Sequence, residues 1–100
     1  MVAKKSDAMK LLEKITGGPL TFSSMLRAIR EGEEMSLAEF AAELGISRSH
    51  LCDIEQGRKA VSVERAALWA DTLGQSKKQF VRLALQSEVD RAGLDYKVAL

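Results

Sequence analysis

The sequence predicts an all-α fold, and three observations indicate it. Apolar residues recur at the spacing of an amphipathic helix over most of the chain, a serine precedes most of these segments, and a glycine follows most of them. The chain also has one proline and few β-branched residues, a composition that favours helices over sheets. With 100 residues, of which 46% are hydrophobic and 29% charged, it is long and apolar enough to bury the core of one domain.

Two helices are expected in the first third of the chain. Residues 7–16 form a short amphipathic segment that the Gly-Gly-Pro run at 17–19 ends. Residues 22–33 form the next helix, because four apolar side chains recur there at helical spacing: Phe22, Met25, Leu26 and Ile29. We therefore assign residues 1–20 to a short N-terminal helix and linker, and residues 21–93 to the main domain.

Two short helices follow. Ser36 is placed to accept a hydrogen bond from the backbone N–H of Glu39, whose side chain can reach back, which makes a capping box. Gly45 ends this helix. Ser47 is placed to cap the next helix, which runs to about residue 56.

The junction of these two helices has the pattern of a helix-turn-helix unit. A glycine permits the positive φ that turns the chain sharply, and Ile46 then packs beneath the turn. The apolar and small positions of the pattern are Phe40, Ala41, Leu44, Ile46, Leu51 and Ile54. With Leu51 and Ile54 pointing inward, His50 lies at the edge of the outer side of the second helix, and four side chains lie on it: Arg48, Ser49, Cys52 and Asp53.

Two further helices repeat the same serine-to-glycine design. Ser62 and Gly74 bound the first of them. Ser76 and Gly93 bound the second, with Gln79 expected as the reciprocal capping partner of Ser76.

Residues 22–83 resemble the Cro/repressor-type helix-turn-helix family, also described as XRE-like or lambda-repressor-like. The resemblance rests on the turn itself, on the "IEQGRK" exit from the second helix, and on the "A-x-x-LG-x-S" close of the following helix, at the family's distances. It implies a five-helix globule that binds operator DNA, usually as a dimer, with residues 47–56 as the recognition helix in the major groove. The family often places glutamine after the serine that caps the second family helix, as a phosphate anchor; here that position is Leu37.

The resemblance and the turn together single out eight candidate DNA contacts: Ser47, Arg48, Ser49, His50, Cys52, Asp53, Arg58 and Lys59. Arg48 is expected to contact a base, in the bidentate manner of arginine with guanine, or a phosphate; otherwise it is a solvated arginine. Ser49 either bonds a base or phosphate or simply helps to start the helix. His50 either contacts a phosphate or is an ordinary, partly exposed histidine near the start of the helix. Cys52 is expected to be passive rather than redox-active.

The remaining candidates carry charge. Asp53 would be repelled by phosphates, so it either accepts from a cytosine amine or orients Arg48 from within the helix. Arg58 and Lys59 lie in the loop that leaves the recognition helix, where they either clamp a phosphate or are simply solvated.

Several classes of function are disfavoured. The sequence has no phosphate-binding loop and one histidine, and its prominent serines already have capping roles, so no enzyme is predicted. One cysteine and one histidine fall short of a zinc site, and no metal or other cofactor is expected. No apolar run approaches a membrane span and no signal peptide is apparent, so the expected location is the cytoplasm.

The function expected is that of a sequence-specific DNA-binding transcriptional regulator, acting as a homodimeric repressor on a palindromic operator. The alternative is an antitoxin that binds a small toxin protein and represses its own operon. The expected partners are therefore double-stranded DNA, a second copy of the chain and, in the alternative, a toxin; no membrane is expected. A formal net charge of +1 gives the whole chain no nucleic-acid signature, so the prediction depends on local geometry.

The last seven residues, "LDYKVAL", leave the helical period. Apolar residues alternate there with others, which is the period of a half-buried strand: Leu94, Tyr96, Val98 and Leu100. A lone strand needs a partner for its backbone groups. It would pair with the same strand of a second protomer, add to a sheet edge of a toxin or other partner, or stay disordered as chain ends often do.

Overall fold

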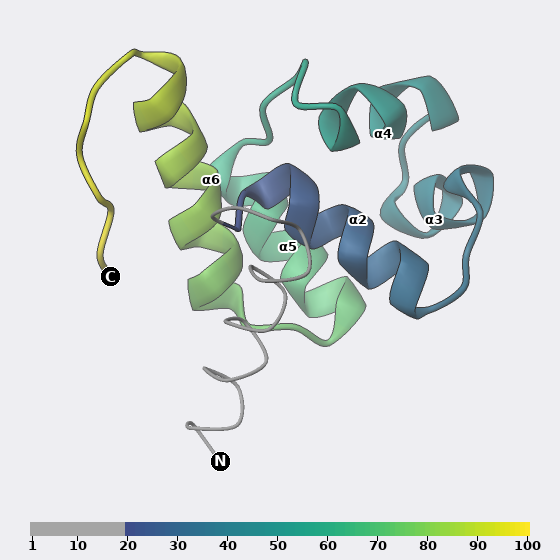
Figure 1. Cartoon of the computed structure of the whole chain (residues 1–100). Coiled ribbons are helices and arrows are strands. Elements are labelled where there is room, and N and C mark those ends of the chain that lie inside the picture. Colours follow the sequence, from purple (N-terminus) through teal and green to yellow (C-terminus); the bar gives the residue numbers. More distant parts are fainter. Residues whose placement is uncertain (1–19) are drawn as a thin grey trace.

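The computed structural model describes residues 20–100, so the helix expected at 7–16 lies outside the described residues. The described chain is all-helical, as predicted (Figure 1). Its five helices are α2 (Phe22–Gly32), α3 (Leu37–Leu44), α4 (Arg48–Glu55), α5 (Val63–Leu73) and α6 (Lys77–Arg91).

Each of the five helices begins at a hydroxyl side chain that accepts a hydrogen bond from the third backbone N–H of the helix: Thr21, Ser36, Ser47, Ser62 and Ser76. At α3 the capping box is complete, because the Glu39 carboxylate accepts from the Ser36 N–H at 2.8 Å. The reciprocal contact expected of Gln79 at α6 is not made. Its side-chain oxygen accepts instead from Nε of Arg82 at 3.3 Å, one turn further along the helix.

The core lies where α2 passes between the other helices. Helix α2 packs on α4 and α6, α3 packs on α4 and α5, and α5 packs on α6. The largest fully buried side chains come from every helix except α5: Leu26, Phe40, Leu51, Ile54, Phe80 and Leu83. At the α2–α6 contact, the rings of Phe22 and Phe80 meet edge to face with centroids 5.7 Å apart, a favoured aromatic geometry.

The predicted C-terminal strand does not form within the described chain. Residues 94–100 have no regular secondary structure and run back along the outer side of α6 (Figure 1). The alternation of apolar residues is real, but the residues described here include no neighbouring strand with which it could pair. None of the described helices is both long and apolar enough to cross a bilayer.

Candidate nucleic-acid interface

The turn between α3 and α4 has the predicted left-handed glycine. Gly45 has φ +76°, and its backbone N–H reaches the carbonyl oxygens of the last turn of α3. The next N–H, that of Ile46, donates to the Ala41 carbonyl at 3.0 Å, so the chain leaves α3 through a Schellman-type turn. Because Ala41 is both small and buried, α3 and α4 can approach closely at this point.

A buried hydrogen bond fixes the end of α3 to the body of the domain. The indole Nε1–H of Trp69, on α5, donates to the Leu44 carbonyl at 3.1 Å. Arg65 lies over the same ring, with its guanidinium carbon 5.6 Å from the ring centroid. The position from which α4 starts is therefore set by α5 as well as by the turn.

Helix α4 presents the predicted faces. Leu51 and Ile54 are buried, whereas Arg48 and Ser49 are exposed. His50, Cys52 and Asp53 are half-buried at the sides of the exposed strip. Ser47 is exposed at the N-terminus, where its Oγ accepts from the His50 N–H at 3.1 Å, so this hydroxyl is used as a cap.

Asp53 pairs with a residue other than the one expected. Its carboxylate lies 2.9 Å from the Arg58 guanidinium, not against Arg48, and 4.0 Å from Nζ of Lys59. The backbone repeats the connection, because the N–H groups of Arg58 and Lys59 both donate to the Asp53 carbonyl. The hydrogen bond that Arg58 donates to the Asp53 carboxylate raises the pKa of Arg58. Asp53 therefore orients the loop arginine and folds the "GRK" loop onto the end of α4.

A buried ion pair on the inner side of α4 was not predicted from the sequence. Glu55 accepts two hydrogen bonds from Arg30 of α2, at 2.8 and 3.0 Å, and its carboxylate is only 2% exposed. Arg27, one turn earlier on α2, lies 3.5 Å from the same carboxylate. Arg30 also donates to the Met35 carbonyl, in the segment before α3, and its hydrogen bonds to Glu55 raise its pKa. This bidentate pair locks the end of α4 to α2.

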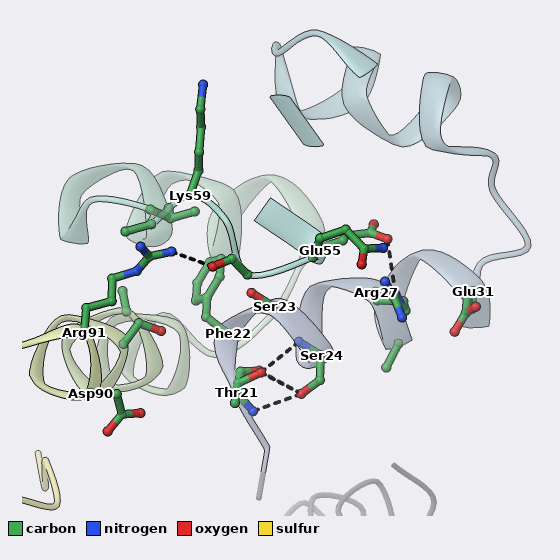
Figure 2. A pocket seen from close by; sticks show the side chains of 17 residues that line it. Thr21, Phe22, Ser23, Ser24, Arg27, Glu31, Glu55, Lys59, Asp90 and Arg91 are labelled. Atoms are coloured by element: carbon green, nitrogen blue, oxygen red, sulfur yellow. Dashed lines mark hydrogen bonds and ion pairs between the residues drawn. The ribbon is translucent and has the colours of Figure 1, made fainter. Parts of the chain in front are cut away.

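A hollow of about 700 Å³ lies behind the end of α4, between the start of α2, the loop after α4 and the end of α6 (Figure 2). Two hydrogen bonds hold its walls together. Arg91 donates to the Gly57 carbonyl at 2.8 Å, and the Ser23 hydroxyl donates to the Ile54 carbonyl at 2.6 Å. The lining contains three cations and three anions: Arg27, Lys59, Arg91, Glu31, Glu55 and Asp90. Such balanced charge favours neither an anionic nor a cationic ligand, and we assign the hollow no role.

The candidate contacts lie on the outer side and edges of α4 and in the loop after it, and Asp53 joins the two through Arg58 and Lys59. Three cations, Arg48, Arg58 and Lys59, lie there with one anion, Asp53. Among the residues that the structure describes, no group of His, Cys, Asp or Glu side chains is arranged to hold a metal ion. The chemistry of the surface is that of a polar, mildly basic helix on a rigid support, which suits the major groove of DNA.

The fold and this surface define a DNA-binding helix-turn-helix domain. Comparison with known families agrees, since the helix-turn-helix family model HTH_3 matches residues 26–80. The chain belongs to this family, as the resemblance to Cro/repressor-type proteins implied, and the family is a DNA-binding regulatory one rather than a typically enzymatic one. No curated protein and no solved structure matches the chain significantly.

Proposed function

We propose that the protein is a sequence-specific transcriptional repressor that binds a palindromic operator as a homodimer, with α4 in the major groove of each half-site. One observation carries the proposal. Arg48, in the first turn of α4, is exposed and forms no ion pair with the described residues, while the opposite side of the helix is fixed by Leu51, Ile54 and Glu55. An arginine on a rigid helix is the commonest reader of guanine.

The other residues of the surface divide into two roles. Ser49, His50 and Cys52 surround Arg48 and contact base edges or the nearest phosphate. Arg58 and Lys59 contact the phosphate backbone beside the groove, because they lie in the loop that leaves α4 and their side chains are exposed. Asp53 holds Arg58 in place before DNA arrives.

Selection of bound sites from random duplexes tests the proposal, and Arg48→Ala tests the register of α4. We expect this variant to lose about 1–3 kcal/mol of binding free energy on the selected site and to relax the preference at one base pair per half-site. Lys78→Ala is the matched control, because it removes one exposed positive charge from the first turn of α6 and should leave the base preference unchanged. An unchanged preference in Arg48→Ala would show that the register is wrong.

Arg58→Ala tests the phosphate contact. It should weaken binding to all sequences alike and reduce the slope of the salt dependence by about one. Asp53→Asn should instead strengthen binding to unrelated DNA, because it removes the anion that competes with phosphate for Arg58. Fluorescence anisotropy titrations at several salt concentrations measure both effects. Equal slopes of affinity against salt concentration for wild type, Arg58→Ala and Asp53→Asn would contradict the phosphate contact of Arg58.

The homodimer is tested by the length of the site. A palindrome with half-sites about 34 Å apart, one helical turn, should bind far more tightly than a single half-site. Equal affinity for the half-site and the full site would refute a dimeric mode of binding.

A further inference from the structure

The C-terminal tail, residues 94–100, is held to α6 at its start by the Leu94 N–H, which donates to the Val89 carbonyl at 3.2 Å, and further along by the side chain of Gln86. The Nε2 of Gln86 donates to the Tyr96 carbonyl at 2.8 Å, and its Oε1 accepts from the Val98 N–H at 2.8 Å. One amide thus binds the backbone on either side of Lys97. A residue in a parallel strand makes the same two contacts with its neighbour, so the Gln86 side chain substitutes for one residue of an adjoining strand.

This clamp uses one edge of the tail and leaves the other edge open. In an extended chain, successive residues direct their N–H and C=O groups to opposite edges. Since Tyr96 and Val98 direct theirs towards Gln86, the groups of Asp95 and Lys97 point to the opposite edge. The tail lies on the outer side of α6, away from the rest of the domain (Figure 1). Its apolar side chains are also largely uncovered: Leu94 is 50%, Tyr96 68% and Leu100 54% exposed.

We propose that the open edge of the tail pairs with the tail of a second copy of this chain, antiparallel and about a two-fold axis at Tyr96. The charges select this register. It sets Asp95 of each copy opposite Lys97 of the other, and Leu94 opposite Val98. A shift of the axis by one residue would instead set Lys97 against Lys97 or Asp95 against Asp95. Opposite charges facing each other across strands stabilise the pair, and like charges destabilise it.

The hydrogen-bonding pattern permits this register, and the charges distinguish it from the two shifted ones. With the axis at Tyr96, the residues that exchange backbone hydrogen bonds across the two strands are Asp95 and Lys97, whose groups lie on the open edge. A lysine on an open edge normally discourages pairing with other strands. Here the two-fold arrangement neutralises it with Asp95 of the second copy, so the edge favours its own copy over an unrelated strand. The inference rests on the homodimer of the proposed function and not on its binding to DNA.

Charge exchange in the full-length protein tests the pairing. Asp95→Lys and Lys97→Asp each set like charges opposite one another twice in the dimer, and should raise the dimer dissociation constant about tenfold. The exchange of both residues in one chain should restore it to within about threefold of wild type. An equimolar mixture of the two single variants should also associate, because each then meets the opposite charge. Analytical ultracentrifugation without DNA measures all four, and Glu64→Lys and Lys78→Asp are the charge-matched controls.

The outcomes separate the tail from the DNA-binding surface. Single variants that dimerise as tightly as wild type would overturn the pairing, and if Arg48→Ala still relaxed the base preference, the proposed function would stand without it. A wild-type chain that stays monomeric would also overturn it, and would leave the open edge to a strand of another protein, such as a toxin. If the tail variants dimerise as expected but the wild-type protein shows no preference among DNA sequences, the pairing is supported and the proposed repressor function is refuted.

Discussion

The ion pair between Arg30 and Glu55 allows the strongest quantitative prediction. Replacing Arg30 with methionine leaves a carboxylate that is 2% exposed without its bidentate partner. Breaking a buried pair in this way costs about 3–5 kcal/mol, because an uncompensated charge stays in the interior. Arg30 is itself 15% exposed, and Arg27 remains 3.5 Å from the carboxylate as a partial substitute, so the lower end of this range applies.

A loss of about 3 kcal/mol is a large share of the free energy of unfolding of a domain of this kind, which is roughly 5–15 kcal/mol. It corresponds to a fall in Tm of roughly 12–24 °C for a domain of about 100 residues. Urea unfolding followed by circular dichroism at pH 7 gives the free energy directly. The double variant Arg30→Met/Glu55→Met should recover most of the loss, since replacing both charges with apolar side chains is often neutral or stabilising.

Arg27→Met is the matched control, because Arg27 is 41% exposed and the ion pair that it forms should contribute at most about 1 kcal/mol. If Arg30→Met cost no more than Arg27→Met, the reasoning would be refuted. The Glu55 carboxylate would then be solvated or satisfied by Arg27 alone.

Three further predictions concern the helix ends. Gly45→Ala should destabilise the fold by about 1–2 kcal/mol in urea unfolding through its φ of +76° alone, because no atom lies within 4 Å of an added Cβ; a larger loss would indicate a clash instead. Ser47→Ala should cost about 1 kcal/mol by the same assay and Ser47→Asp much less, since the aspartate keeps a cap for the His50 N–H; equal losses would rule out capping as the cause. The hydrogen bond from the Ser36 N–H lowers the pKa of Glu39, so the stabilisation that the Glu39 carboxylate gives the fold is fully present above its ordinary pKa of 4.5 and is lost as the pH falls through the lower pKa of the folded state. Glu39→Gln should remove this part of the acid sensitivity. A pH profile of stability that is the same in Glu39→Gln and wild type would contradict the prediction.

The sequence predicts the helix boundaries well because their determinants are local. A hydroxyl at the N-cap and a glycine after the last turn act within a few residues, so Ser36, Gly45 and Ser62 mark their helix ends unaided. The family match confirms the helix-turn-helix class that the same residues indicated.

Contacts between distant residues were not predicted. Arg30 and Glu55 are 25 positions apart, and neither position has an unusual neighbourhood in the sequence. A signal did exist, since Glu55 lies four residues after Leu51 and next to Ile54, on the inner side of α4. A charge at such a position requires a buried partner, but the sequence does not show which arginine supplies it. The partner of Asp53 is a similar case, because the fold of the loop after α4 brings Arg58 to it rather than Arg48.

The C-terminal tail shows a different limit. The apolar residues in 94–100 alternate with the period of a strand. A strand, however, also needs a neighbouring strand for its hydrogen bonds, and the alternation does not show which chain supplies it. Within the described chain, the neighbour is a side chain, that of Gln86.

The hydroxyl caps have one more consequence. All five described helices start from a group that carries no charge at any ordinary pH: Thr21, Ser36, Ser47, Ser62 and Ser76. The ionic contacts of the fold instead join one element to another, as Arg30–Glu55 and Asp53–Arg58 do. Protonation therefore leaves these hydroxyl caps intact, and at the start of α3 it acts on the Glu39 carboxylate that completes the capping box.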